Sequence, residues 1–256
     1  MIPKFVICGI EHSGTTLLSD LFRQADNLDS GFEVGVLLSN SPREFRHLEN
    51  FRSQIASGWG IEEDQISEVC DCDTFSEFYQ RLYDLSRVIQ KPSEIFDKTP
   101  RYLAKLEECS SKLDVPFISM YKDPKSIVHS DFCRSGTNDF NDWYSRYLNS
   151  KLSYMRTLYS SYVRHTGDRR RSDRVRFVSL EEICLNAGEV LRGLFEFVEV
   201  DFSVRYLLLD NLRYKHTHGR SIDVSDPFKY LKDFDPQTCA LIDQDFAEFE
   251  HWFYRP

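Results

Sequence analysis

The stretch that decides the fold is KFVICGIEHSGTTLL, residues 4–18. It joins a short apolar segment, Phe5 to Ile7, to a turn framed by Gly9 and Gly14, and then enters a helix with leucines at helical spacing. The two glycines have the spacing of a phosphate-binding loop, in which backbone N–H groups and a helix N-terminus hold an anion. Thr15 stands where such loops carry lysine, which argues against ordinary ATP or GTP chemistry and favours a different phosphorylated ligand.

The position of this loop predicts a ligand site. A strand that runs directly into it places the loop at the carboxyl end of the strand, the edge where open α/β sheets bind ligands. Ser13, Thr15 and Thr16 add hydroxyl groups that suit an anion. A simpler interpretation stays open, namely a turn rich in serine and glycine that only joins a strand to a helix.

Four further segments have the apolar pattern of strands, and helical patterns separate them. They are residues 30–38, 95–97, 115–121 and 175–180. Alternating strands and helices indicate βαβ crossovers. We therefore expect an α/β fold, a three-layer sandwich with helices on both faces of a mainly parallel sheet of about five strands. At 256 residues the chain favours a single domain, residues 1–256, with helical insertions.

Composition and charge argue against nucleic acid, an anionic membrane and a zinc ion as binding partners. The net charge is −9 and the pI is near 5.3, which argues against nucleic acid or an anionic membrane as the main partner. The seven cysteines are scattered and form no C-x-x-C pair, a pattern typical of reduced thiols in the cytoplasm and not of a zinc site. No apolar run approaches the roughly 18 residues of a membrane span, so neither an anchor nor a signal peptide is expected.

A second anion site is predicted where the apolar segment 115–121 ends. Lys122 follows the strand, and Asp123 and Pro124 provide the N-cap and the first position of the next helix. Ser130 lies about two turns along that helix, so a cation and a hydroxyl can hold one phosphate from two sides. A lysine beside Asp123 does not suit magnesium, so no metal is expected here.

In combination these motifs resemble those of the sulfotransferases that use 3′-phosphoadenosine 5′-phosphosulfate (PAPS), especially the bacterial enzymes and the heparan and tyrosylprotein branches. The first loop of that family typically reads K/R-S/T-G-T-T, and residues 12–16 read HSGTT. The 3′-phosphate motif, R-D-P followed by a serine, is similar to KDP at 122–124 with Ser130. A third family motif, E-K-S/T-P-x-Y, is similar to DKTPRY at 97–102.

Two further segments extend the resemblance over nearly the whole chain. Residues 180–197 look like the family's passage E-D-L followed by E-x-L-R-x-L-x-x-F. Residues 216–221, HTHGRS, are a looser match to the K-G-R-type loop that closes over the nucleotide. The resemblance implies a P-loop-like fold related to nucleotide kinases, PAPS as the cofactor, 3′,5′-adenosine bisphosphate as its product, and no metal.

The resemblance also assigns residues to the cofactor. The loop around the 5′-phosphosulfate is matched by His12, Ser13, Gly14, Thr15 and Thr16. The 3′-phosphate site is matched by Lys122 and Ser130, and Arg220 is a further candidate from the loose C-terminal match. Because Lys122 replaces an arginine, it gives up the bidentate fork that suits phosphate.

Three residues are candidates for catalysis. Glu33 occupies the place of the glutamate that deprotonates the acceptor in the heparan and tyrosylprotein branches. Lys98 suits the cation that offsets charge on the leaving phosphate, with His12 as a possible helper. His12 replaces the usual lysine or arginine, so its charge depends on pH, and Asp97 is one methylene shorter than the family's glutamate. In isolation, each candidate is also compatible with an ordinary surface or loop residue.

The sequence thus predicts transfer of a sulfuryl group from PAPS to a hydroxyl, with an amine as the second choice, of a small molecule or glycan. Helical insertions at about 40–90 and 138–162 are expected to form a lid and the acceptor side. Two alternatives remain: a P-loop kinase with an altered lysine, motivated by the glycine spacing, and a non-catalytic nucleotide-binding protein, motivated by His12. The acceptor and the oligomeric state are left open.

Overall fold

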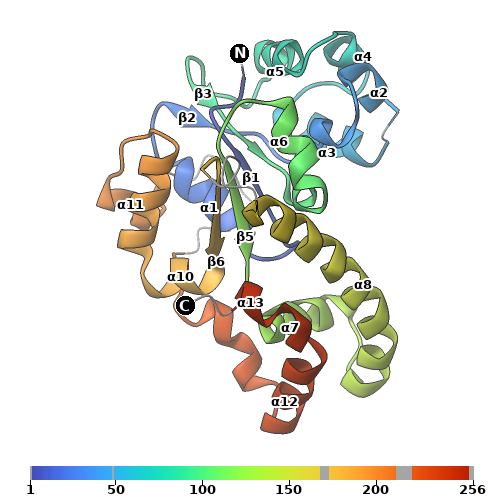
Figure 1. The fold of residues 1–256 in the computed structure, drawn as a ribbon. Coiled ribbons are helices and arrows are strands. Elements are labelled where there is room, and N and C mark those ends of the chain that lie inside the picture. Colours follow the sequence, from blue (N-terminus) through green and yellow to red (C-terminus); the bar gives the residue numbers. More distant parts are fainter. Residues whose placement is uncertain (1, 48, 168–172, 212–220, 254–256) are drawn as a thin grey trace.

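The computed structural model describes residues 2–47, 49–167, 173–211 and 221–253. Its centre is a parallel four-stranded sheet with the strand order β4-β1-β5-β6 (Figure 1). The strands are β1 Val6–Gly9, β4 Asp97–Lys98, β5 Phe117–Tyr121 and β6 Val175–Ser179. The parallel α/β arrangement predicted from the sequence is confirmed, and its first strand runs directly into the glycine-framed loop.

The sheet is buried on both faces, which explains why its middle strands are almost entirely apolar, with Ser119 of β5 as the exception. Val6 and Cys8 contribute to one hydrophobic core, and Phe5 and Ile7 contribute to the other. Helices α1 and α11 cover the second face, while α6 and α8 cover the first (Figure 1). Their bounds are α1 Thr15–Phe22, α6 Leu106–Lys112, α8 Phe140–Gly167 and α11 Ala187–Phe197.

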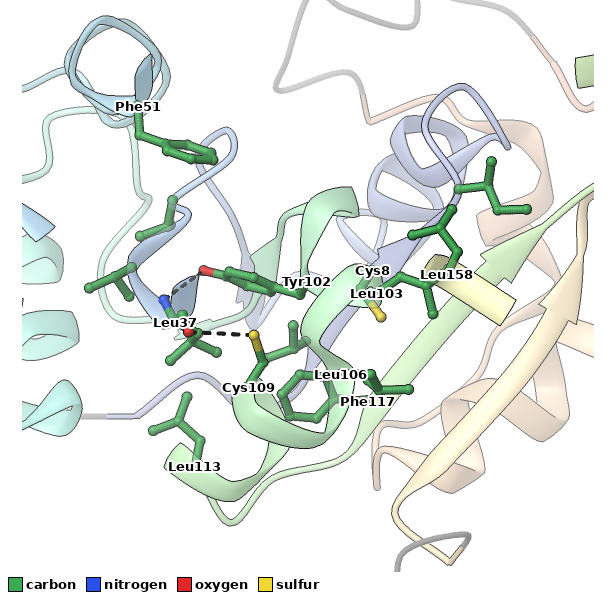
Figure 2. Packing of buried hydrophobic residues seen from close by; sticks show 14 of the residues in the cluster. Cys8, Leu37, Phe51, Tyr102, Leu103, Leu106, Cys109, Leu113, Phe117 and Leu158 are labelled. Atoms are coloured by element: carbon green, nitrogen blue, oxygen red, sulfur yellow. Dashed lines mark hydrogen bonds between the residues drawn. The ribbon is translucent and has the colours of Figure 1, made fainter. Parts of the chain in front are cut away.

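The core under α6 also fixes the segment that follows the second strand. Figure 2 shows Leu103, Leu106 and Phe117 packed together beside Leu37. The Leu37 backbone N–H donates to the Tyr102 hydroxyl over 3.4 Å, and its carbonyl accepts from the thiol of Cys109, also over 3.4 Å. The segment is therefore attached to the core by its backbone.

The prediction of a strand at residues 30–38 is wrong. The strand of this region is β2 Leu28–Asp29, which pairs in parallel with β3 Glu94–Ile95 in a separate two-stranded sheet. Residues 36–38 form the 3-10 helix η1 Val36–Leu38. The main sheet accordingly has four strands, one fewer than the expected number of about five.

The physical reason is that side chains, and not a neighbouring strand, satisfy the backbone of this segment. The N–H groups of Val34 and Gly35 donate to the Thr99 hydroxyl oxygen over 3.1 and 3.2 Å. In addition, the Ser30 hydroxyl donates to the carbonyl of Phe96 over 2.7 Å. Segment 30–35 is thus a loop held by Phe96 and Thr99, the residues on either side of β4.

In the insertion predicted at about 40–90 the structure describes four helices, the last of which ends at residue 85, and β3 begins at residue 94. Its helices are α2 Pro42–Phe45, α3 Glu49–Trp59, α4 Gln65–Cys70 and α5 Phe75–Leu85. The rest of the chain adds η2 Pro100–Lys105, α7 Pro124–Ser135, α10 Leu180–Leu185, η3 Val204–Leu208, η4 Asp226–Lys232, α12 Pro236–Asp245, η5 Ala247–Phe249 and α13 Glu250–Phe253. Within the described residues, no helix is both long and apolar enough to cross a membrane.

Gly14 allows the loop to turn into α1. It forms the N-cap of that helix with φ 90° and ψ 12°, a left-handed conformation that side chains disfavour. A Cβ atom here would also lie only 2.7 Å from Cδ1 of Leu180. The second glycine of the motif is therefore required by the backbone, independently of any ligand.

We expect Gly14→Ala to lower the free energy of unfolding by about 1–2 kcal/mol, because alanine strains the left-handed backbone and crowds Leu180. Chemical denaturation measures the change. Gly193→Ala is the matched control: this glycine lies in α11 with no atom near the added Cβ, so the substitution should stabilise the helix by up to about 1 kcal/mol. Equal effects of the two substitutions would contradict a special role for Gly14.

Candidate active site

A cavity of about 730 Å³ lies at the carboxyl edge of the sheet. Residues from the segments after all four strands line it, including Gly14 after β1, Pro100 after β4, Lys122 after β5 and Leu180 after β6. This is the edge at which parallel sheets bind ligands. The cavity therefore has the position that the glycine-framed loop predicts.

The cavity brings together residues that are far apart in the sequence. Seven of the predicted site residues line it, namely His12, Gly14, Thr15, Thr16, Glu33, Lys122 and Ser130. Lys98 is buried directly behind this wall, where it contacts Glu33. Arg220 and the segment 216–221 lie outside the described residues, apart from Ser221.

Ser13 is the predicted site residue that the structure does not bring to the cavity. Its side chain is buried, and its hydroxyl donates to the carbonyls of Ile10 and Met120 over 2.6 and 3.2 Å. Its N–H donates to Ile10 as well, over 3.1 Å. Ser13 therefore fastens the loop to β5, and its position does not support the predicted contact with a bound phosphosulfate.

The expected pairing of Lys122 with Ser130 is present. Nζ of Lys122 donates to the hydroxyl of Ser130 over 2.7 Å, and both residues line the cavity. Asp123 accepts from the N–H of Lys125 as the N-cap of α7, and its own N–H donates to Glu181 on α10 over 3.0 Å. This cap fixes where α7 starts, and so places Ser130 two turns later beside Lys122.

Lys122 has an unusual acidity. Only 2% of the residue is exposed, and burial lowers its pKa from the ordinary 10.5 to about 8. The carboxylates of Asp131 and Glu181 partly counter this shift, and the cations Lys151 and Arg134 add to it. Lys122 therefore loses its positive charge near pH 8, a pH at which binding experiments on a folded protein are practical.

If the Lys122–Ser130 pair holds a phosphate group, as the sequence predicts, 3′,5′-adenosine bisphosphate should bind more weakly as the pH rises above about 8. Its phosphates are already fully ionised there, because the second pKa of a phosphate monoester is about 6. In the free protein, however, Lys122 loses its proton above about pH 8 and must regain it to bind an anion. Affinity should then fall about tenfold per pH unit, measured by calorimetry.

Lys122→Arg is the control for this pH dependence. A guanidinium stays protonated over the whole range, so affinity should no longer depend on pH between about 8 and 9.5. An unchanged slope in this variant would assign the titration to another group.

His12 does not carry the permanent positive charge of the lysine or arginine that the family has at its position. It has a left-handed backbone with φ 66°, and its side chain is exposed on the cavity wall. Partial desolvation, with Arg134 and Lys122 nearby, lowers its pKa below the ordinary 6.5, although Asp131 and Glu11 oppose this shift. At neutral pH the imidazole is therefore mainly uncharged and offers hydrogen bonds without a fixed positive charge.

The sequence interpretation missed Arg134, Asp226 and Lys229, which also line the cavity. Arg134 lies on α7 one turn beyond Ser130, so the i, i+4 relation on that helix could have indicated it. Asp226 and Lys229 belong to η4, which no motif connects with the site. The cavity is thus more basic at the Lys122 end than the predicted residues alone suggest.

Glu33 and Lys98 form an ion pair at the other end of the cavity. Nζ of Lys98 lies 3.0 Å from Oε1 of Glu33 and 4.1 Å from the centre of the Phe32 ring. The side chain of Lys98 is 3% exposed, while that of Glu33 is 18% exposed. The Glu33 carboxylate can therefore accept a proton at the cavity wall. Once Glu33 is protonated, the positive charge of Lys98 is available to another anion.

A buried network around Asp97 holds the loop that carries Glu33. The Asp97 carboxylate accepts from the hydroxyls of Tyr79, Tyr102 and Thr99 over 2.6, 2.8 and 2.8 Å. Thr99 in turn accepts from the N–H groups of residues 34 and 35. Burial and the Asp97 charge raise the pKa of Tyr79 well above its ordinary value, so this phenol stays protonated and donates. Asp97 thus acts on Glu33 through its neighbours.

The helices of the 40–90 insertion contact the same loop. The indole N–H of Trp59, at the end of α3, donates to the carbonyl of Phe32 over 3.0 Å. A Cβ on Gly31 would lie 2.5 Å from the Trp59 ring, so only glycine allows this approach. Phe51 and Gln54 of α3 line the cavity. Among the described residues, none from 138–162 lines it, so the expected acceptor-side role of α8 is not supported.

Comparison with known proteins agrees with this geometry. The model of the sulfotransferase family matches residues 3–204, and the chain belongs to that family. A comparison with curated proteins finds no significant match.

Solved structures of sulfotransferases share the fold. The sulfotransferase domain from the curacin biosynthetic pathway is 16% identical with a TM-score of 0.63, over 100% of this chain and 99% of that one. The domain from the Synechococcus olefin synthase is 17% identical with a TM-score of 0.66, over 95% and 93%. A mouse sulfotransferase complexed with PAP is 13% identical with a TM-score of 0.55, over 95% and 83%. At such identities the likeness shows the fold alone.

Proposed function

We propose that this protein transfers a sulfuryl group from PAPS to a hydroxyl group, with an amine as the second choice, of a small molecule or glycan. The observation that carries the proposal is the single cavity that joins the glycine-framed loop, the Lys122–Ser130 pair and the Glu33–Lys98 pair. Family membership supports the transferase class. The mouse relative, solved with PAP, supports the nucleotide.

In this proposal the two ends of the nucleotide occupy the two anion sites. The start of α1, with Gly14, Thr15 and Thr16, receives the 5′-phosphosulfate, because the first N–H groups of a helix lack intrahelical partners. Lys122 and Ser130 receive the 3′-phosphate. Arg134 adds positive charge to that end, and Arg220 is retained as a candidate from the sequence. We assign no metal to the reacting centre, where side-chain cations supply the positive charge.

The proposed reaction is an in-line displacement at sulfur. The acceptor oxygen forms a new bond to sulfur as the bond between sulfur and the 5′-phosphate oxygen breaks, and Glu33 takes the acceptor proton. Lys98, paired with Glu33 in the free protein, offsets charge that grows on the leaving phosphate. His12, uncharged at neutral pH, donates a hydrogen bond there. The products are the sulfated acceptor and 3′,5′-adenosine bisphosphate.

The surroundings of Glu33 indicate where the acceptor binds. Phe32, Phe51 and Pro100 line the cavity beside the carboxylate, together with Gln54. This mixed wall suits an acceptor with an apolar part next to its hydroxyl. The free cysteines of the chain fit a reducing compartment such as the cytoplasm, and we treat residues 1–256 as one domain.

Thermal unfolding with two nucleotides tests the proposal. A ligand at 100 times its dissociation constant stabilises the native state by about 2.7 kcal/mol, so 3′,5′-adenosine bisphosphate should raise the melting temperature by several degrees. ATP with magnesium should not. Stabilisation by ATP alone would favour a kinase, and stabilisation by neither would favour a protein that does not bind nucleotides. Transfer of radiolabelled sulfate from PAPS to a panel of hydroxyl and amine acceptors then tests the reaction.

A further inference from the structure

A second cluster of reactive side chains lies near the basic end of the cavity. His129 and Cys133 are one turn apart on α7, and Asp233 directly follows η4. Nε2 of His129 lies 2.6 Å from Oδ2 of Asp233 and 3.6 Å from Sγ of Cys133. All three ligand atoms lie within 4.8 Å of one another. The cluster thus offers nitrogen, sulfur and oxygen donors from two elements far apart in the sequence.

The spacing of these atoms suits a tetrahedral transition-metal ion. With bonds of about 2.0–2.1 Å to nitrogen and 2.3 Å to sulfur, the two ligand atoms lie about 3.5 Å apart in a tetrahedral site. The observed separation of Nε2 and Sγ is 3.6 Å. The Asp233 side chain is 60% exposed, so it can withdraw from the imidazole to admit an ion between them.

Other features of the cluster agree with a metal site. The His129 ring is mostly buried, and its orientation is fixed by an edge-to-face contact with Phe234 at 5.4 Å. Cys133 is exposed, so an ion could enter from solvent and keep a water as its fourth ligand. Imidazole and thiolate donors select zinc-like ions over magnesium or calcium. The sequence did not indicate the site, because the aspartate lies 100 residues beyond Cys133.

We propose that His129, Cys133 and Asp233 bind one zinc-class divalent ion that links α7 to the end of η4. The ion would hold two elements that both contribute to the cavity. Ser130 and Arg134 directly follow the two α7 ligands, and Lys229 of η4 lines the same cavity. Metal binding should therefore favour nucleotide binding, a consequence that rests on the proposed function, whereas the metal site itself does not.

Cobalt serves as the spectroscopic probe. The full-length protein, without an affinity tag and treated with a chelator, is titrated with Co²⁺. We expect one equivalent to produce a thiolate-to-cobalt charge-transfer band and the visible bands of a tetrahedral ion, and Zn²⁺ to remove both. Cys133→Ser should abolish the charge-transfer band. His129→Gln and Asp233→Asn should each weaken binding tenfold or more.

Cys239→Ser is the matched control, because Cys239 is also partly exposed but lies outside the cluster. It should bind cobalt like the unaltered protein. The proposal is overturned if no charge-transfer band forms, which would leave His129 and Asp233 as a simple hydrogen-bonded pair. It is also overturned if His129→Gln and Asp233→Asn both bind cobalt with unchanged affinity, or if the band disappears in Cys239→Ser. None of these readouts uses a nucleotide, so they are independent of the proposed sulfuryl transfer.

A separate measurement tests the coupling between metal binding and nucleotide binding. The affinity for 3′,5′-adenosine bisphosphate is compared with and without saturating Zn²⁺, in the unaltered protein and in Cys133→Ser. We expect Zn²⁺ to tighten binding severalfold in the first and to have no effect in the second. Equal affinities with and without Zn²⁺ in the unaltered protein would overturn the coupling between the two sites.

Discussion

Glu33→Gln is expected to lower the rate of sulfuryl transfer by a factor of about 10²–10⁴, the usual contribution of a general base. The amide oxygen can still accept from Nζ of Lys98, which lies 3.0 Å from Oε1 of Glu33, so the geometry of the cavity wall is retained. The amide cannot take a proton from the acceptor. Affinity for 3′,5′-adenosine bisphosphate should stay close to that of the unaltered protein, because its two proposed phosphate sites, the start of α1 and the Lys122–Ser130 pair, do not include Glu33.

Glu11→Gln is the matched control for this prediction. Glu11 also lines the cavity, but it pairs with the half-exposed Arg101 at 3.0 Å, and no role in proton transfer is assigned to it. Initial rates of radiolabelled sulfate transfer, with nucleotide affinity measured in parallel, should show near-normal turnover for this variant. If Glu33→Gln retains normal turnover, or if both variants lose it equally, Glu33 is not the base.

The positions of the glycine-framed loop and of the Lys122–Ser130 pair could be predicted from the sequence because local patterns determine them. An apolar strand, a glycine-framed turn and a helix follow one another in the chain, and this local order places Gly14 at the carboxyl edge of the sheet. Likewise, the Asp123 cap and the pitch of α7 place Ser130 beside Lys122 without any long-range information. Both predictions depend on elements that are adjacent in the chain.

The differences between the sequence-based expectations and the structure concern residues whose partners are distant in the sequence. The Ser13 hydroxyl turns inward because the Met120 carbonyl of β5 lies beneath the loop, and no local pattern indicates that partner. The apolar pattern of residues 30–38 predicts a strand, but the N–H groups of Val34 and Gly35 donate to the Thr99 hydroxyl and not to a neighbouring strand. Likewise, Lys229 reaches the cavity only through the packing of η4, which local spacing does not reveal.

The insertion, which the sequence predicts to form a lid, also contacts the structure that holds Glu33. Trp59 of α3 and Tyr79 of α5 both contact the structure that holds Glu33, one through the Phe32 carbonyl and the other through Asp97. The same α3 helix presents Phe51 and Gln54 to the cavity. A change in these helices is therefore expected to affect the position of the proposed base as well as the acceptor wall.

Asp97→Ala is expected to lower the free energy of unfolding by about 3–5 kcal/mol, which corresponds to a fall in melting temperature of roughly 10 °C. The carboxylate is fully buried and accepts from three hydroxyl groups. Its removal leaves the buried hydroxyls of Tyr79, Tyr102 and Thr99 without this acceptor and opens a small cavity. Calorimetric or chemical unfolding measures the loss without any need for an acceptor substrate.

Two milder variants separate the network from simple loss of packing. Asp97→Asn keeps the volume and one acceptor oxygen, and Tyr79→Phe removes a single donor, so each should cost less, about 1–2 kcal/mol for the tyrosine. Because Thr99 connects Asp97 to the N–H groups of Val34 and Gly35, we also expect a graded loss of transfer rate in the same order. Nucleotide affinity should change little, since Lys122 and Ser130 lie on other elements. If the three variants lose stability but transfer at an equal rate per folded molecule, the network supports only the fold and does not position Glu33.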